Sequence, residues 1–103
     1  MHCNKFRNKP TEVDGIRFAS KREANRYSEL KLLERAKVIK DLQLQVRFPL
    51  KINDQLICTY VADFQYLENG KQVVEDTKGV KTREYILKKK LMLALYQISI
   101  LET

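Results

Sequence analysis

Histidine is almost absent from this chain, and several catalytic motifs are absent with it. His2 is the only histidine among the 103 residues, so neither a Ser-His-Asp nor a Cys-His catalytic arrangement can be built. Gly-rich phosphate loops, GxSxG elbows and HExxH zinc motifs do not occur in the sequence either. Candidate chemistry therefore rests on carboxylates and lysines.

Cysteines and long apolar runs are also scarce. Cys3 and Cys58 are far apart and form no CxxC motif, so we expect reduced thiols rather than a disulfide framework or a structural zinc site. No apolar run is long enough to span a membrane, and the N-terminus has basic residues but no apolar segment of the secretory kind. We therefore expect a cytoplasmic protein without a membrane partner.

Positive charge, in contrast, is abundant. The chain has 20 Lys and Arg residues against 13 Asp and Glu residues, which gives a formal net charge of +7. Such an excess favours polyanionic partners, because phosphate neutralisation supplies most of the non-specific affinity of nucleic-acid binders. Charge by itself does not identify DNA, since many small proteins are basic for solubility. The length fits a flexible basic arm at residues 1–12 and a single domain at 13–103.

Hydrophobic periodicity predicts a domain of the α/β (α+β) class. Apolar residues at helical spacing alternate with runs of period two, which are typical of half-buried strands. A crossover helix before a final strand normally gives a parallel pair, so we expect a mixed sheet flanked by helices. In chain order the predicted elements are a tight turn at Asp14-Gly15, a helix from Ser20 to about Lys37, strands at Leu42–Ile52 and Leu56–Tyr66, a third strand after Asn69-Gly70, a helix from about Thr82 to Gln97, and a last strand at Ile98–Leu101.

Two of these elements carry finer expectations. Pro49 has no amide hydrogen to donate to a strand ladder, which favours an edge position or a bulge for its strand. The second helix has an apolar stripe that we expect to face the core. That stripe consists of Leu87, Leu91, Ala94, Leu95 and Ile98.

The hairpin around Asn69-Gly70 defines the candidate site. Asn-Gly between two runs rich in Val, Phe and Tyr predicts a two-residue type I′ turn. This register places Asp63 opposite Asp76. Because side chains alternate with period two, it also puts Lys78 on their face and Glu75 on the other. We therefore expect Glu75 not to be catalytic.

Two directly opposed aspartates repel each other unless another charge offsets the repulsion. A hard divalent cation such as Mg²⁺ would do so, because it prefers carboxylate oxygens. The alternative is a surface hairpin in which Asp63 and Asp76 are solvated and Lys78 is incidental. The residues by themselves leave both interpretations open.

Two roles are open to Glu23. Ser20-Lys21-Arg22-Glu23 is a capping box, in which the glutamate bonds the N-cap amide and complements the helix dipole. Its spacing to Tyr27 and Leu30 also places it at the N-terminal end of the apolar stripe, facing the body of the protein. Sequence physics by itself favours the capping role.

A resemblance to a known family extends this interpretation. Asp63, followed after the hairpin by Asp76-Thr77-Lys78, resembles the Asp and (Asp/Glu)-x-Lys signature of the PD-(D/E)XK nuclease superfamily, although Ala62 stands where that pattern has proline. The element order is similar to the restriction-endonuclease-like αβββαβ core of that superfamily. Further segments resemble small phage and prophage proteins of uncharacterised function that are placed in it, namely residues 13–18, 20–23, 39–45 and 74–79.

The resemblance implies Mg²⁺- or Mn²⁺-dependent hydrolysis of phosphodiester bonds. In many such nucleases an acidic residue on the first helix completes the metal site. Glu23 would then join Asp63 and Asp76 as a ligand, with the backbone carbonyl of Thr77 as a further one. Lys78 would orient the attacking water or stabilise the charged transition state. The implied catalytic set is Glu23, Asp63, Asp76 and Lys78.

The implied activity is that of an endodeoxyribonuclease of phage origin. At the family level the expected substrate is branched DNA such as a Holliday junction, cut during phage recombination or replication, and a homodimer would supply two cuts. Two alternatives stay open: a non-cleaving DNA-binding or regulatory module that keeps the nuclease fold, and a nuclease directed at RNA.

Residues that would contact the DNA are less clearly marked. Cations near a helix start favour phosphate, because the amide groups and the helix dipole point there. A solvated helix face explains such lysines equally well. The candidates are Lys81 and Arg83 at the start of the second helix, Lys88 and Lys89 within it, and Gln45 and Arg47 on the polar face of the first long strand.

Overall fold

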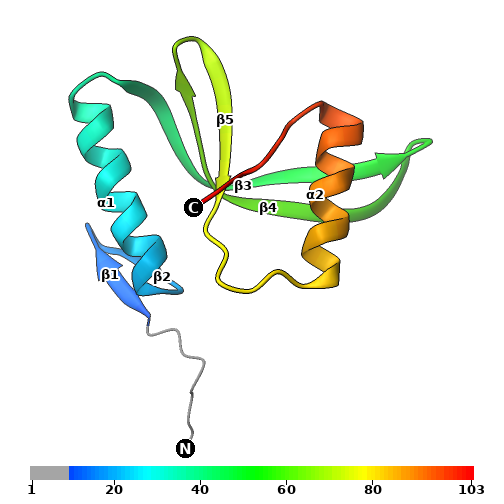
Figure 1. Cartoon of the computed structure of the whole chain (residues 1–103), viewed down its shortest axis with the longest axis horizontal. Helices are drawn as coiled ribbons and strands as arrows, with labels where there is room; N and C mark the ends of the chain where they lie inside the picture. Colours follow the sequence, from blue (N-terminus) through cyan, green and yellow to red (C-terminus); the bar gives the residue numbers. More distant parts are fainter. Residues whose placement is uncertain (1–9) are drawn as a thin grey trace, which may run out of the picture.

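The computed structural model describes residues 10–103 (Figure 1). Most of the predicted basic arm, with His2 and Cys3, lies outside the described residues. The arm ends earlier than predicted, because Thr11 and Glu12 already belong to a strand. The elements are β1 (Thr11–Val13), β2 (Ile16–Phe18), α1 (Lys21–Arg35), β3 (Ile39–Ile52), β4 (Gln55–Glu68), β5 (Lys71–Asp76), α2 (Arg83–Tyr96) and β6 (Leu101–Glu102).

The predicted α+β class and element order are confirmed. The main sheet has the strand order β3-β4-β5-β6, and a short hairpin of β1 and β2 stands apart from it. β3, β4 and β5 are antiparallel neighbours, whereas β6 runs parallel to β5 after the crossover through α2. Pro49 lies in β3, which is an edge strand as predicted. No helix of residues 10–103 is long and apolar enough to cross a membrane.

Local capping signals set the helix ends. Ser20 caps α1, and its hydroxyl accepts a hydrogen bond from the Glu23 amide at 3.1 Å. Thr82 caps α2 in the same way, with the Tyr85 amide as donor at 3.1 Å. At the other end of α2, Gln97 adopts a left-handed conformation with φ of 57°. Both helices therefore lie within two residues of their predicted bounds.

The core has two parts, one under each helix. Tyr27 and Leu30 of α1 pack with Phe64 and Tyr66 of β4. On the other side Met92 of α2 packs with residues of β4, β5 and the segment before β6. In Figure 1 the two helices accordingly flank the strands from opposite sides. The second group consists of Leu50, Tyr60, Ala62, Val74, Tyr85, Met92 and Ile100.

The predicted core face of α2 is wrong in part. Its buried residues are Tyr85 and Met92, whereas Leu87 is 56% exposed and Leu95 is 36% exposed. Residues seven positions apart share a helix face, so Tyr85 and Met92 form one stripe. Tyr60 and the segment before β6 pack against that stripe, so Tyr85 and Met92 are buried and the leucines are left exposed. The last strand is also shorter than predicted, because only Leu101 and Glu102 pair with β5.

The predicted register of the β4–β5 hairpin is confirmed. Glu68 pairs with Lys71, and Phe64 pairs with Glu75 at the far end of the ladder. Asn69 and Gly70 both have positive φ, at 54° and 76°, as a type I′ turn requires. The turn thereby fixes which residues of β4 and β5 face each other.

β3 is distorted beside the candidate site. The ladder pairs Leu44 with Phe64 and Val46 with Ala62, so Gln45 falls opposite Asp63. Gln45 has a φ of 52°, which is uncommon for a residue with a side chain. The regular ladder is therefore interrupted at the point where β3 meets the carboxylates.

Gly70 should be needed for stability, whereas Gly79 should not. Gly70→Ala places a side chain in the left-handed region, although nothing lies within 4 Å of the added Cβ. We expect the free energy of unfolding to fall by about 1–2 kcal/mol, measured by urea denaturation. Gly79→Ala, also in open space but without a positive φ, is the matched control and should change stability by less than about 0.5 kcal/mol. Equal losses in both variants would contradict a register set by this turn.

Candidate functional site

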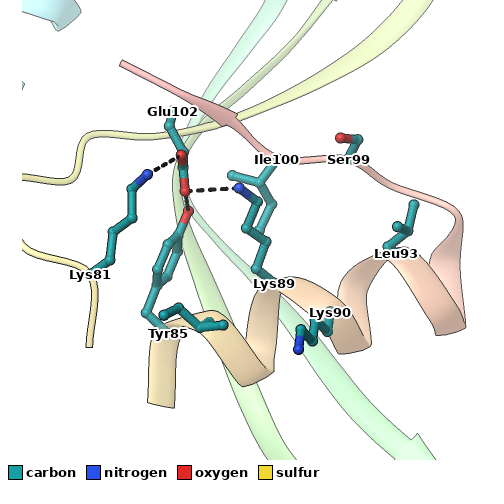
Figure 2. Close-up of a pocket in the computed structure, with 9 residues that line it drawn as sticks. Lys81, Tyr85, Lys89, Lys90, Leu93, Ser99, Ile100 and Glu102 are labelled. Carbon is teal, nitrogen blue, oxygen red and sulfur yellow. Dashed lines mark hydrogen bonds and ion pairs between the residues drawn. The ribbon is translucent and has the colours of Figure 1, made fainter. Parts of the chain in front are cut away.

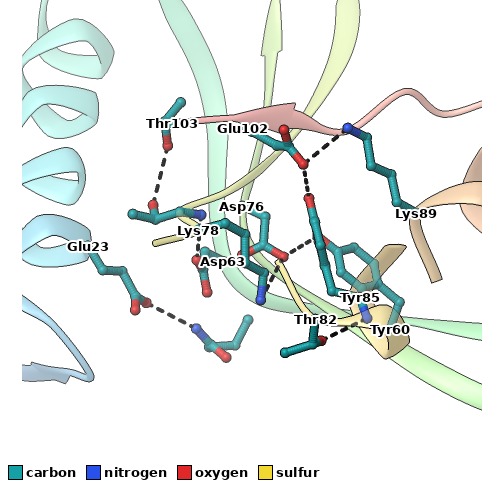
Figure 3. A network of polar contacts seen from close by, with 12 residues as sticks. Glu23, Tyr60, Asp63, Asp76, Lys78, Thr82, Tyr85, Lys89, Glu102 and Thr103 are labelled. Carbon is teal, nitrogen blue, oxygen red and sulfur yellow. Dashed lines mark hydrogen bonds and ion pairs between the residues drawn. The ribbon is translucent and has the colours of Figure 1, made fainter. Parts of the chain in front are cut away.

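Two aspartates on neighbouring strands form the centre of the site. The β4–β5 ladder ends at Phe64 and Glu75, and one further step places Asp63 opposite Asp76. The Thr77 amide donates a hydrogen bond to Asp63 Oδ2 at 2.9 Å. The Tyr60 hydroxyl donates to Asp76 Oδ2 at 2.6 Å (Figure 3). Each carboxylate is thus held by a different donor.

The surroundings of Asp76 disfavour its charged form. The residue is only 2% exposed. Burial, together with the neighbouring Asp63, raises the pKa of its carboxyl to about 7, although Tyr60 and Lys78 act to lower it. Carboxyl groups that share a site and cannot both ionise easily are typical of functional centres, where a bound cation can compensate their charge.

Lys78 lies beside this carboxyl pair, as the alternation predicts. Its Nζ is 3.7 Å from Asp76 Oδ2. The same ammonium lies 4.6 Å from the centre of the Tyr85 ring, so a cation–π contact holds it from the side of α2. The Lys78 side chain is 30% exposed and can still meet a ligand from solvent.

Glu23 approaches the aspartates from α1. Its amide serves the helix cap, while its carboxylate accepts a hydrogen bond from Gln45 Nε2 at 3.4 Å and points toward the site in Figure 3. Burial, together with the charges of Asp63 and Asp76, raises the pKa of Glu23 to about 7. The Ser20 half of the predicted capping box therefore forms, whereas the Glu23 carboxylate bonds Gln45 rather than the Ser20 amide, so that part of the prediction is wrong. In residues 10–103 no three acidic, His or Cys side chains are already arranged to hold one ion.

Thr77 links the site to the C-terminal strand. Its hydroxyl lies 3.3 Å from that of Thr103, and the Thr103 amide donates to the Asp76 carbonyl at 3.1 Å. The role of the Thr77 carbonyl as a metal ligand stays a prediction.

Glu75 lies on the α1 side, and the structure gives it a structural partner. The residue is fully buried, and Arg26 of α1 binds it through two hydrogen bonds of 2.9 and 2.7 Å. The Tyr66 hydroxyl also donates to it. These contacts join α1 to β5 next to Asp76 and account for the burial of the Glu75 carboxylate; that Glu75 is not catalytic stays a prediction.

Removing Arg26 should cost much more than removing a surface arginine. Arg26→Ala leaves the Glu75 carboxylate buried without its main partner, so we expect the free energy of unfolding to fall by roughly 3 kcal/mol. Arg35→Ala, at the exposed end of α1, is the matched control and should shift it by about 0.5 kcal/mol or less. Chemical denaturation of both variants measures the difference. A small effect of Arg26→Ala would mean that the ion pair does not hold α1 in place.

Two of the predicted DNA-contact residues bind a carboxylate instead of standing free. Lys81 and Lys89 lie 3.0 and 3.1 Å from Glu102, and the Tyr85 hydroxyl donates to the same side chain at 2.8 Å (Figure 2). These donors hold the pKa of Glu102 at about 2. The cluster lines a pocket of about 270 Å³ between α2 and β6. Contact of these lysines with nucleic acid stays a prediction.

Other predicted contact residues lie nearer to the aspartates. Lys88 forms an ion pair with Glu84 at 3.5 Å and, with Lys78, lines a pocket of about 210 Å³ at the start of α2. Arg47 is exposed and pairs in the ladder with Val61, which lines the same pocket. Gln45 reaches Glu23, whereas Arg83 is exposed at the first position of α2. The sheet register thus places Gln45 and Arg47 on the face that carries Asp63.

Sequence reasoning missed the two tyrosines of the site. Tyr60 precedes Asp63 by three positions, and strict alternation would put their side chains on opposite faces. The Tyr60 hydroxyl nevertheless reaches Asp76 from the neighbouring strand. Tyr85 connects Lys78 with Glu102 and is visible in sequence only as one aromatic residue in a helix. No local pattern marks either residue.

Removing the Asp76 charge should stabilise the fold at high pH. A carboxyl whose folded pKa lies above its unfolded value favours the folded state while protonated, and this contribution is lost as the pH rises from about 4 to about 7. Asp76→Asn avoids that loss and can still accept from Tyr60. We expect it to exceed the wild type by about 1–2 kcal/mol in free energy of unfolding at pH 8 and to match it near pH 4.

Urea denaturation at the two pH values measures this difference. Glu12→Gln, which removes an exposed carboxylate from β1, is the control and should leave the pH dependence unchanged. A wild type that is more stable than Asp76→Asn at pH 8 would show that the folded protein favours the charged carboxylate.

Comparison with known proteins gives one match. The model of a family described as protein of unknown function, DUF1064, matches residues 3–101. No curated protein and no solved structure matches the chain.

Proposed function

We propose that this chain, which belongs to the DUF1064 family, is a metal-dependent endodeoxyribonuclease that hydrolyses phosphodiester bonds. The observation that carries the proposal is the meeting of Asp63, Asp76 and Lys78 at one point of the sheet. The carboxylates suit a divalent cation, and the ammonium suits a phosphate. The α+β order with a parallel last strand is consistent with a PD-(D/E)XK nuclease core.

The residues fit Mg²⁺ or Mn²⁺ chemically. Mg²⁺ is usually bound through one or two carboxylates, with waters and substrate phosphate oxygens as its other ligands. Asp63 and Asp76 are such a pair, and their shared electrostatic cost is the kind that a cation removes. Glu23 and the Thr77 carbonyl would complete the set. A bound ion supplies charge neutralisation and Lewis-acid activation for phosphoryl transfer.

The chain's own groups position the reactants. Tyr60 and the Thr77 amide fix one oxygen of each aspartate, which pre-organises the pair before a ligand arrives. Lys78, held between Asp76 and the Tyr85 ring, is placed to neutralise charge that develops on a phosphoryl oxygen. Lys78 and Thr82 line one pocket, so the dipole of α2 favours an anion beside Lys78.

The net charge of +7 favours a long polyanion, and DNA is the proposed substrate because the resemblance to PD-(D/E)XK nucleases implies it. We further propose a phage protein that acts on branched DNA of the Holliday-junction type, with a homodimer making paired cuts. Lys88, which lines the pocket at the start of α2 together with Lys78, would hold the flanking backbone, and the exposed Arg47 and Arg83 are further candidates.

Cleavage of labelled DNA tests the proposal. Purified protein should cut plasmid, single-stranded or four-way-junction DNA with Mg²⁺ or Mn²⁺ and not with EDTA. Asp76→Ala should lower the rate at least about a hundredfold while DNA binding persists, because the carboxylate would hold the metal ion and not the DNA. The control Glu12→Ala changes an exposed carboxylate of β1 that is outside the proposed ligand set, and it should cut normally.

Two results would count against a nuclease centred on Asp76. One is the absence of metal-dependent cleavage on every form of DNA tested. The other is cleavage by Asp76→Ala at the wild-type rate, which would point to a contaminant or another site. Cleavage of RNA but not DNA would change the proposed substrate to RNA and would still support metal-dependent hydrolysis of phosphodiester bonds.

A further inference from the structure

A pocket opens on the α1 side of the aspartates. Its volume is about 280 Å³, and Glu23, Gln45 and Asp63 line it. A ligand seated there would therefore lie directly beside the proposed cleavage centre. The pocket is separate from the one at the start of α2, which shares none of these residues.

Apolar side chains make up much of the wall of this pocket. Ile16 and Phe18 come from β2, and Leu44 comes from the distorted stretch of β3. Polar groups stand among them, namely the Gln45 amide and the exposed Arg17 guanidinium. A cavity of apolar walls with a few polar groups suits a flat ring that has hydrogen-bonding edges.

Charge separates the two pockets beside the site. The pocket at the start of α2 contains Lys78, Lys88 and one carboxylate, and it suits a phosphate. The pocket on the α1 side contains the carboxylates of Glu23 and Asp63 and one cation, Arg17. The proposed metal would occupy those two carboxylates, so the rest of the lining is mainly apolar and favours a neutral group over an anion.

The β1–β2 hairpin gains a role from this geometry. It stands outside the main sheet, yet residues 16–18 form one wall of the pocket. On the facing side, the positive φ of Gln45 interrupts the ladder where the pocket meets Asp63. The separate β1–β2 hairpin and the distorted stretch of β3 therefore border the same pocket.

We propose that the pocket receives the base of an unpaired nucleotide adjacent to the phosphodiester bond that is cut. This inference rests on the proposed function and specifies its substrate as DNA with locally unpaired nucleotides. A base inside a duplex must be unstacked and unpaired before it can enter a pocket, and this costs least when the base is already unpaired. Fully paired duplex is accordingly the poorer substrate.

Binding without divalent ions tests the pocket separately from cleavage. The probe is a duplex with one bulged 2-aminopurine nucleotide, and the same sequence fully paired is the reference. We expect the wild type to bind the bulged duplex about tenfold more tightly and to change the fluorescence of the probe. Ala19→Trp adds a large side chain at an exposed residue that lines the pocket, and it should abolish both effects.

The matched control is Ala94→Trp, which adds the same side chain at an exposed position of α2 outside the pocket. It should bind as the wild type does, and circular dichroism should show both variants folded. Equal affinity for bulged and paired DNA, or unchanged binding by Ala19→Trp, would overturn the inference.

Cleavage with Mg²⁺ on the same two duplexes then separates the two proposals. Faster cutting beside the bulge, lost in Ala19→Trp, supports both. Equal cleavage rates on the bulged and the fully paired duplex refute the pocket inference but are consistent with the proposed nuclease. Preferential binding of the bulge without cleavage of any DNA refutes the nuclease and supports the pocket as a base-binding site.

Discussion

The ion pair between Arg26 and Glu75 holds the two halves of the candidate site together. Glu75 is completely buried, and the guanidinium meets it with two hydrogen bonds. Glu23 lies one turn before Arg26 on α1, and Asp76 directly follows Glu75 on β5. The pair thus sets how close the helix carboxylate comes to the sheet carboxylates. A buried pair of this kind is weak evidence for stability by itself, because desolvation offsets much of the attraction. Its clearest contribution here is to fix one packing of α1 on the sheet.

Successive side chains of β5 alternate between the α1 side and the α2 side of the sheet. Glu75 faces α1 and is neutralised there, whereas Asp76 contacts Tyr60 and Lys78 on the side of α2. The buried negative charges of these two adjacent carboxylates are therefore compensated in different ways. One has a fixed cation inside the fold, and the other is left with a raised pKa and only a partial partner. A protein under selection for stability alone would have little reason to keep the second arrangement, and this supports a binding role for Asp76.

Local signals in the sequence predicted the features that local chemistry controls. Asn69-Gly70 predicted the hairpin register, and Ser20 and Thr82 marked the helix starts, because turns and caps depend on neighbouring residues. The core face of α2 and the partners of Glu75 and Glu102 depend on residues far away in the chain, so no local pattern revealed them. The leucine stripe of α2 was misleading for the same reason: burial is decided by what packs against a helix. Glu23 lies between these cases, since its cap was visible but its approach to the aspartates depends on Arg26.

The site divides the molecule by charge. The pocket on the α1 side has two carboxylates and Arg17 among apolar side chains, and the pocket on the α2 side has Lys78 and Lys88 near a helix start. Asp76 lies between them, close to Asp63 on one side and to Lys78 on the other. A nucleotide has the same division, with a neutral base and an anionic phosphate. Under the proposed function the two pockets would receive the two parts of one nucleotide, with the phosphate beside Lys78 and the base beside the β1–β2 hairpin.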